Sequence, residues 1–325
     1  MMQDEFSALT QFSQEYLSFP PFLAAFEEIE RSIQLYRAGA ITQHLLVTGE
    51  SGTGKTTLCR LISQKYPRVV LPERDVQPVL YISIPPAATI VSVSEAMLAK
   101  LGDPNPTLGT SSTKTARVVR LAQACSVELL LLDEANHIQD RGQSPTQYLV
   151  GDWIKGLMDG LQIPAVLLGL PRVESLLRVN EQLRRRFTRR MRMELGQSPE
   201  KSIEQECLEL FYTLIHSMPI PFSIGSESWD ALAHRLYFAT DGRVAYLKKL
   251  LTGAIRLSFE LDLSEIRCQE LAQAFEAEIW PQGIGPLNPF SHDFAFRRLD
   301  RQGEPFEQGA IASRPGTRRA YAKQI

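Results

Sequence analysis

The segment Gly49-Glu-Ser-Gly-Thr-Gly-Lys-Thr56 constrains the fold more than any other part of this 325-residue chain. It matches the pattern G-x-x-x-x-G-K-[ST], and it lies between the predicted strand His44–Thr48 and the predicted helix Lys55–Tyr66. Glycines let the backbone N–H groups of such a loop turn inward around phosphate oxygens, and the helix N-terminus adds its positive end. We therefore expect a phosphate-binding loop made of Gly49, Glu50, Ser51, Gly52, Thr53, Gly54, Lys55, Thr56 and Thr57.

A second motif, Leu129-Leu-Leu-Leu-Asp133-Glu134, is an apolar strand that ends in two acids. An Asp at the carboxyl end of a parallel strand faces the ligand crevice, so Asp133 and Thr56 are the predicted ligands of Mg²⁺. Lys55 is expected to contact the β and γ phosphates. Glu134 is placed to polarise the attacking water. The two motifs predict an ATPase with ATP and Mg²⁺ as cofactors, and the choice of ATP over GTP follows only from the class of enzyme.

Apolar strand patterns alternate with helical periodicity as far as about residue 198. Strands are expected at residues 44–48, 79–84, 127–133, 163–169 and 189–195, and helices at 55–66, 91–101, 114–125 and 173–187. Because such alternation favours a parallel sheet covered on both faces, the predicted fold class is α/β. The strand at 79–84 lies between the two motifs in sequence, which indicates that an extra strand separates the strands carrying them. That arrangement is typical of AAA+ ATPases, which act in assemblies.

Four regions are expected along the chain. A helical extension covers residues 1–40, and the α/β nucleotide-binding domain covers 41–198. A small α-helical lid covers 199–280, with helices at 203–217, 229–239, 244–260 and 264–279. Residues 281–325 turn to Pro, Gly and scattered Arg, which is typical of a flexible tail.

The overall composition excludes some classes of function. Lys plus Arg (35) nearly balances Asp plus Glu (37), so nucleic-acid binding would have to come from local clusters rather than from the net charge. No apolar run approaches the roughly 18 residues that a membrane helix needs, and the acidic N-terminus does not resemble a signal peptide. The four cysteines are widely spaced and are expected to be buried thiols. We therefore expect a cytoplasmic protein without membrane contact.

Several arginines are candidates for sensing a nucleotide. Arg184, Arg185 and Arg186 precede the fifth predicted strand, where AAA+ ATPases carry the arginine finger that reaches the nucleotide of a neighbouring subunit. A solvated basic helix face is the alternative. Arg243 resembles the sensor-2 arginine of the lid, although it could also be an ordinary residue at a helix start. At the end of the fourth strand Gly169 stands where a polar residue is expected, so either a neighbour positions the water or hydrolysis is slow and regulatory.

With these features the sequence resembles the TniB/TnsC family of transposition ATPases over about residues 10 to 260. The resemblance rests on four segments, which are His44–Thr56, Leu131–His137, Leu168–Pro171 and Gln182–Phe187. It implies that ATP-loaded subunits assemble with one another as rings or filaments around double-stranded DNA, independently of its sequence. It also implies that the assembly recruits a transposase, that a TniQ-like targeting adaptor nucleates or caps it, and that hydrolysis dismantles it.

The best local candidates for DNA contact are Thr113, Lys114, Arg117 and Arg120, which would bind phosphates without reading bases. The alternative is a mobile surface loop capped by Thr113. Two other functions share the same core motifs. One is a helicase loader or replication initiator, and the other is a nucleotide-switched signalling ATPase that does not bind DNA. His137 is expected to be a structural histidine, and the alternative is that it links the acid motif to DNA or to a neighbouring subunit.

Overall fold

The computed structural model describes residues 2–14, 19–86, 89–138 and 144–307. They fall into two compact units. The first comprises the described part of Tyr16–Thr213 together with Arg243–Ala245. The second comprises the described parts of Met1–Glu15, Leu214–Gly242 and Tyr246–Ile325. Each unit is described by itself below.

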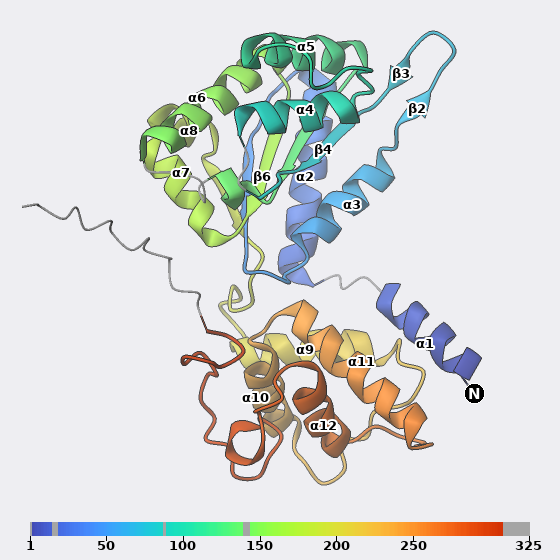
Figure 1. The fold of residues 1–325 in the computed structure, drawn as a ribbon. Helices are drawn as coiled ribbons and strands as arrows, with labels where there is room; N and C mark the ends of the chain where they lie inside the picture. The colour runs from blue at the N-terminus through green and yellow to red at the C-terminus, as the bar shows by residue number, and fades with distance from the viewer. Residues whose placement is uncertain (1, 15–18, 87–88, 139–143, 308–325) are drawn as a thin grey trace, which may run out of the picture. The chain divides into compact units, whose positions relative to one another are not determined.

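The first unit is built on a five-stranded sheet in which every neighbouring pair is parallel (Figure 1). The strands in spatial order are β4 (Val79–Ser83), β5 (Leu129–Asp133), β6 (Ala165–Gly169), β1 (Leu45–Thr48) and β7 (Arg189–Arg192). The predicted α/β fold with a five-stranded parallel sheet is confirmed. An extra strand does separate β1 from β5, but it is β6 and not the strand at 79–84. That strand, β4, pairs with the outer side of β5 and forms an edge of the sheet.

Helices cover both faces of this sheet because its three inner strands, β5, β6 and β1, are mostly apolar and buried on both sides. Leu130 and Leu132 belong to the core that α4, α5 and α6 complete, whereas the equally buried Leu129 and Leu131 alternate to the opposite face. There α3 packs on β4 and β5, and α2 packs on α3 and β7. The helices are α2 (Pro20–Gly39), α3 (Lys55–Lys65), α4 (Ile90–Lys100), α5 (Ser111–Ala124), α6 (Ser144–Leu161), α7 (Glu174–Val179) and α8 (Glu181–Arg186), followed by the first part of α9 (Ile203–Ile215).

The helix predicted at 173–187 is wrong as a single element. A 3₁₀ turn, η2 (Pro171–Val173), is followed by α7 and α8, and these two helices are separated at Asn180, whose φ of −113° and ψ of 101° are extended. The Asn180 side chain accepts a hydrogen bond from the backbone N–H of Leu183 (2.9 Å), which makes it the N-cap of α8. This cap sets the start of the short helix that carries the three consecutive arginines.

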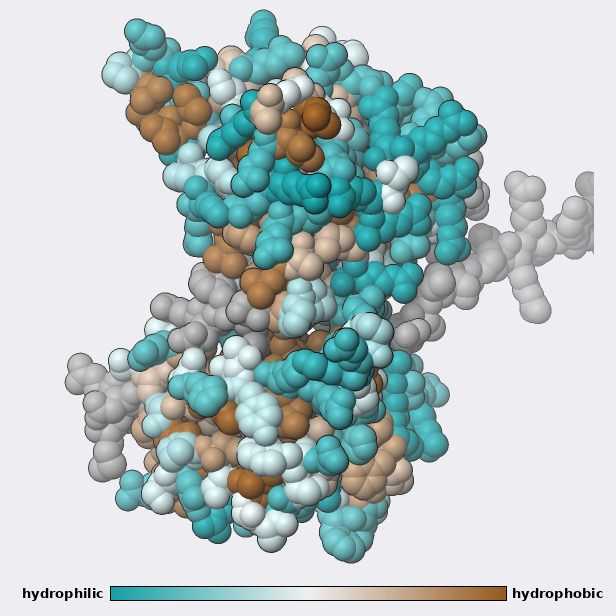
Figure 2. Space-filling model, turned by 180° about the vertical axis from the view of Figure 1, so that it is seen from behind, coloured by the Kyte–Doolittle hydropathy of each residue, from teal (hydrophilic) through white to brown (hydrophobic). Residues whose placement is uncertain are grey.

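A small hairpin and one long helix were missing from the sequence-based prediction. The helix is α6, and the hairpin consists of β2 (Val69–Val70) and β3 (Asp75–Val76), which pair antiparallel. Val69, Val70 and Leu71 are 47%, 76% and 45% exposed, so the hairpin carries an apolar surface. Figure 2 shows this brown patch on the projection at its upper left. Strands of two residues have too little periodicity to be recognised in a sequence.

The second unit is helical, as predicted for the lid. It contains α1 (Met2–Gln14), α10 (Trp229–Thr240), most of α11 (Val244–Glu260), α12 (Cys268–Glu278) and the 3₁₀ turn η3 (Gly285–Leu287). The core of the unit includes buried apolar side chains from the helices α10, α11 and α12, namely Leu232, Leu236, Leu250, Ile255, Leu271 and Phe275.

The tail predicted to be flexible from residue 281 packs on this unit as far as Glu307. Phe294, Leu299 and Phe306 are buried, and the burial of these large apolar side chains stabilises the packed segment. The guanidinium of Arg235 on α10 donates hydrogen bonds to two carbonyls of the segment, Pro289 O (2.7 Å) and Ser291 O (2.8 Å). Residues 308–325 of the predicted tail lie outside the described residues.

Two expectations from composition can be compared with the structure. Cys59, Cys125 and Cys207 are buried free thiols, as predicted, whereas Cys268 is partly exposed. In the described part of the chain, no helix has both the length and the apolar character needed to cross a bilayer.

Candidate functional site

The loop between β1 and α3 has a backbone that requires glycine. Gly52 and Gly54 have φ of 85° and 94°, a left-handed region that glycine adopts without the steric cost of a Cβ. A Cβ at Gly49 would lie 2.7 Å from Thr53 Oγ1 and 3.0 Å from the carbonyl of Met193. The predicted phosphate-binding loop is therefore tightly folded at the carboxyl end of β1.

Lys55, the first residue of α3, is buried inside this loop. Its Nζ donates hydrogen bonds to Gly49 O (2.7 Å) and Glu50 O (2.8 Å). Burial lowers the pKa of Lys55, and the nearby carboxylates of Glu134 and Asp133 act in the opposite direction. Because an ammonium group carries three hydrogens, one remains to be donated to an anion at the mouth of the loop.

The two predicted metal ligands lie together. Thr56 Oγ1 donates to Asp133 Oδ2 at 2.7 Å, and the Tyr81 hydroxyl donates to the same oxygen at 3.3 Å. Burial and the Asp133 carboxylate raise the pKa of Tyr81, so this hydroxyl stays protonated. Hard oxygen donors suit Mg²⁺, which is usually held by one or two carboxylates with phosphates and water. In the described residues no cluster of three or more His, Cys, Asp or Glu forms a different metal site.

Glu134 follows β5 in an uncommon conformation. Its φ of 55° is left-handed, and its backbone N–H donates to Asp133 Oδ1 at 2.9 Å. The Glu134 side chain lines a cavity of about 350 Å³, to which the P-loop also contributes Ser51, Gly52, Gly54, Lys55, Thr56 and Thr57. The predicted general base and the predicted phosphate-binding residues therefore share one cavity.

The three consecutive arginines of α8 differ in their partners. Arg185 pairs with Glu181 of the same helix (2.9 Å), and Arg186 pairs with Asp159 of α6 (2.5 Å). Arg184 is exposed, and among the residues that the structure describes its guanidinium has no ion pair. None of the three lines the cavity of the P-loop in its own chain.

Arg243 precedes α11 and interacts electrostatically with a carboxylate beside the P-loop. Burial and the charge of Glu50 raise the pKa of Glu194, and the cations Arg192, Lys55 and Arg243 oppose this rise. Arg243 therefore contributes positive charge near the predicted nucleotide site.

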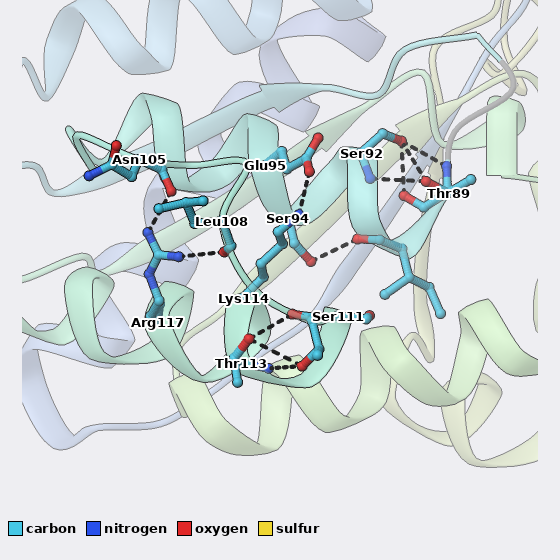
Figure 3. A network of polar contacts seen from close by, with 12 residues as sticks. Thr89, Ser92, Ser94, Glu95, Asn105, Leu108, Ser111, Thr113, Lys114 and Arg117 are labelled. Carbon is cyan, nitrogen blue, oxygen red and sulfur yellow. Dashed lines mark hydrogen bonds and ion pairs between the residues drawn. The ribbon is translucent and has the colours of Figure 1, made fainter.

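The four residues predicted to contact DNA lie on α5, and Figure 3 shows three of them, Thr113, Lys114 and Arg117. The N-cap of this helix is Thr110 and not Thr113, because Thr110 Oγ1 accepts from the backbone N–H of Thr113 (3.3 Å). The Thr113 hydroxyl donates to Thr110 O at 2.9 Å, and the Thr113 side chain is exposed. The helix therefore presents hydroxyl groups at its N-terminus.

Lys114 and Arg117 have structural partners. Lys114 is 3% exposed and forms an ion pair with Glu95 of α4. Arg117 donates to Leu108 O (2.8 Å) and Asn105 O (2.9 Å) of the preceding loop. These contacts, visible in Figure 3, hold α4, the loop and α5 together.

Arg117 also pairs with Asp103, and that hydrogen bond lowers the pKa of this carboxyl. Of the four residues predicted to contact DNA, two therefore make structural contacts within the chain. Lys114 and Arg117 have protein partners, and Arg120 is exposed without an ion pair among the described residues.

Two residues of the site were missed by the sequence analysis. Tyr81 lies two positions before Ser83, whose register partner is Asp133, so strand alternation could have placed Tyr81 on the face of that carboxylate. Asn136 donates from Nδ2 to Glu134 Oε2 at 3.2 Å. Its position two residues after the general base was the available signal. His137 is structural as expected, since its Nδ1 lies 2.8 Å from the Ile84 carbonyl and must donate to it.

Comparison with known proteins identifies relatives of the sequence and of the fold. A family profile described as "Bacterial TniB protein" matches residues 10–195. No protein of curated function matches the sequence. Among solved structures, ORC2 of Aeropyrum pernix in ADPNP and ADP complexes has a TM-score of 0.58 and 13% identity, with 82% of this chain and 70% of that chain covered.

Two further archaeal structures are similar. Cdc6p of Pyrobaculum aerophilum has a TM-score of 0.59 and 14% identity, with 83% and 70% of the two chains covered. ORC1 of Aeropyrum pernix in complex with DNA has a TM-score of 0.57 and 16% identity, with 81% and 66% covered. At such low identity these similarities establish the fold, which is that of AAA+ ATPases.

Proposed function

The chain belongs to the bacterial TniB family and has the AAA+ fold, and from these two premises we propose that it is an ATPase that regulates DNA transposition by assembling on duplex target DNA. The observation that carries the proposal is the 2.7 Å contact between Thr56 Oγ1 and Asp133 Oδ2, at the cavity that Lys55 and Glu134 also line. These four groups are the ones that phosphoryl transfer to water needs from a protein.

In this proposal the P-loop holds the ATP phosphates. The backbone N–H groups of the loop and the N-terminus of α3 bind phosphate oxygens, and Lys55 donates its remaining hydrogen to them. Thr56 and Asp133 hold Mg²⁺, which when bound neutralises charge on the phosphates. Glu134 orients a water molecule and accepts its proton. Asp133 is buried, and the hydrogen bonds that it accepts from Thr56 and Tyr81 hold its carboxylate in place.

The proposed oligomer completes the site with an arginine from a neighbouring copy. Arg184 is the best candidate for this arginine finger, because it is exposed and its neighbours Arg185 and Arg186 already have carboxylate partners. An arginine supplied in trans makes hydrolysis depend on assembly. The resulting ATPase is slow in the free protomer and serves as a timer for the assembly.

The proposed contact with DNA uses the N-terminus of α5 and Arg120. The N–H groups that precede Thr113 at the start of this helix can bind a phosphate, and Arg120 adds positive charge on the exposed side. The Thr113 hydroxyl can join them only by exchanging its bond to the Thr110 carbonyl for one to the phosphate. Lys114 and Arg117 support this surface by holding the loop before α5 in place. One such contact per subunit is weak, but an oligomer adds the contacts of many subunits on one duplex.

The family membership supports a transposase and a TniQ-like targeting adaptor as partners. The similarity to ORC and Cdc6 structures favours a replication initiator as the alternative function, since one of those structures is an ORC1–DNA complex. The two functions differ in the partner protein. Reconstitution with a transposase and a TniQ-like adaptor, compared with reconstitution with a replicative helicase, separates them. Transposition into target DNA supports the proposal, and helicase loading supports the alternative.

Electron microscopy with duplex DNA tests the nucleotide-dependent assembly itself. We expect rings or filaments on DNA with a non-hydrolysable ATP analogue and Mg²⁺, and none without nucleotide. The Lys55→Ala variant should neither bind ATP nor assemble, and Glu134→Gln should assemble but not disassemble. Equal assembly of the wild-type protein with and without nucleotide would refute the proposal, and nucleotide binding without any DNA assembly would support a signalling ATPase.

A further inference from the structure

Asn136 has a side chain whose orientation is determined by its surroundings. It lies in the 3₁₀ turn η1 (Ala135–Ile138) after β5 and is 1% exposed. The backbone N–H of Leu170, the first residue after β6, lies 3.1 Å from Asn136 Oδ1. Because a backbone N–H only donates, the amide oxygen must face Leu170, and the NH₂ group must face the opposite way.

The NH₂ group of Asn136 faces the predicted general base. Asn136 Nδ2 lies 3.2 Å from Glu134 Oε2, whereas the Nε2 of His137 is 4.0 Å from the same oxygen. The Glu134 side chain is 36% exposed at the edge of the P-loop cavity, so solvent alone would leave it several rotamers. A buried amide fixed by the backbone of β6 therefore restrains an exposed carboxylate at the end of β5.

Gly169, the last residue of β6, provides the space for this amide. A Cβ at Gly169 would lie 2.8 Å from Asn136 Oδ1 and 2.6 Å from Val173 Cγ2. Both separations are too short for any side chain at position 169 while Asn136 and Val173 stay where they are. The amide of Asn136, which comes from the turn after the neighbouring strand β5, thus occupies the space that a polar side chain at the end of β6 would fill.

We propose that Asn136 is the positioning residue of the hydrolytic site, and that it performs the role for which β6 offers only Gly169. By holding Oε2 of Glu134, the amide directs the carboxylate toward the cavity where the attacking water is bound. Asn136, in the turn after β5, thereby couples the end of β6 to the general base Glu134. The inference rests on the proposed ATPase activity.

Steady-state ATP hydrolysis with duplex DNA tests the role of the amide. Asn136→Ala should lower kcat by about 10- to 100-fold, because a misplaced general base loses most of its contribution, while KM for ATP changes less than about threefold. Asn136→Asp keeps an oxygen for Leu170 N–H but turns a second oxygen toward Glu134. It should lower kcat at least as much, although it is nearly isosteric and is expected to fold.

Asn288→Ala is the matched control. Asn288 is also buried, its Oδ1 accepts from Phe290 N (3.0 Å), and its Nδ2 donates to a carboxylate, Glu276 Oε1 (3.0 Å), in the other compact unit. This variant loses the same kind of contacts, so it should show a similar fall in melting temperature with unchanged kcat. In a Glu134→Gln background, Asn136→Ala should cause no further loss of kcat, because both residues act in one step.

The outcomes separate this inference from the proposed function. If the wild-type protein hydrolyses ATP and both Asn136 variants have a kcat within about twofold of the wild-type value, the inference alone is overturned. A positioned general base contributes far more than twofold to kcat. An equal loss in Asn288→Ala would also overturn it, because the effect would then be one of stability. A wild-type protein that binds ATP and does not hydrolyse it would overturn the proposed ATPase and the inference together.

Discussion

Arg184→Ala is the substitution that most directly tests whether one protomer completes the site of another. Arg184 is exposed at the surface of α8, has no ion pair among the described residues, and does not line the P-loop cavity of its own chain. Its removal should therefore leave the free energy of unfolding almost unchanged. If it acts as a finger in trans, its removal should instead lower kcat by about a thousandfold, at the low end of the range for such arginines.

The neighbouring arginines supply matched controls with their own magnitudes. Arg185 and Glu181 are 78% and 62% exposed, so Arg185→Ala should cost less than about 0.5 kcal/mol of stability. Arg186 is 29% exposed and pairs with Asp159, which is 48% exposed, so Arg186→Ala should cost about 0.5 to 1 kcal/mol after screening by solvent. Both variants should keep most of the DNA-stimulated ATPase activity.

A mixing experiment distinguishes action in trans from action in cis. Arg184→Ala protomers keep Glu134 but lack the finger, and Glu134→Gln protomers keep the finger but lack the base. In a random one-to-one assembly, about one interface in four joins an intact base to an intact finger, so about a quarter of the wild-type activity should return. The measurement is phosphate release on duplex DNA at a fixed total protein concentration.

The result that would refute the reasoning is a mixture no more active than the sum of its components, provided that electron microscopy shows both variants in the same filaments. Full activity of Arg184→Ala alone would also exclude Arg184. If Arg185→Ala or Arg186→Ala then behaved as predicted here for Arg184, the pairing with Glu181 or Asp159 would have to break in the oligomer.

Three further predictions concern stability and DNA binding. Burial lowers the pKa of His44 from 6.5 to about 4. The contribution of the neutral ring to the free energy of unfolding is therefore fully present above pH 6.5 and is lost as the pH falls toward 4. Urea unfolding over this pH range should show a fall in the free energy of unfolding that stays below about 3 kcal/mol, because the ring is partly exposed to solvent. The His44→Gln variant should show a flatter dependence on pH. Lys114→Ala should destabilise the protein by about 1 to 3 kcal/mol, because it removes the buried partner of Glu95, whose side chain is 30% exposed. Arg120→Ala should leave the melting temperature unchanged and weaken DNA binding with a smaller salt dependence. If the segment after α12 is packed on the second unit, Phe294→Ala should lower the free energy of unfolding by about 3 kcal/mol. The side chain of Phe296 is 44% exposed, so Phe296→Ala should lower it much less. Equal melting temperatures for the two variants would contradict that packing.

The parts of the fold and site that the sequence predicted are those encoded by neighbouring residues. The P-loop, the strand that ends in Asp133 and the alternation of strands with helices each depend on local patterns. The order of the strands does not. The insertion of β6 between β1 and β5 depends on which strands pair, and these three strands are all mostly apolar and buried on both faces.

The sequence was least informative where a residue type has two possible partners. Lys114 and Arg117 are basic residues on a helix with exposed hydroxyl groups, which is a pattern expected for phosphate binding. Only the structure places Glu95 beside Lys114, and Asp103 with the Leu108 carbonyl beside Arg117. An ion pair across 14 or more residues requires the tertiary fold, so charge patterning alone cannot separate a ligand contact from a structural one.

The distribution of the site between protomers has a thermodynamic consequence for the proposed assembly. The P-loop, Asp133 and Glu134 belong to one chain, whereas Arg184 is proposed to act on the nucleotide of another. A nucleotide that strengthens contact between protomers by a given factor must itself bind more tightly to the assembled protomer by that same factor. Hydrolysis removes the γ-phosphate on which both contacts depend, so it weakens nucleotide binding and assembly together. Asn136 acts only on the rate of this step, and substitutions there should lengthen the life of an assembly without changing its nucleotide-dependent stability.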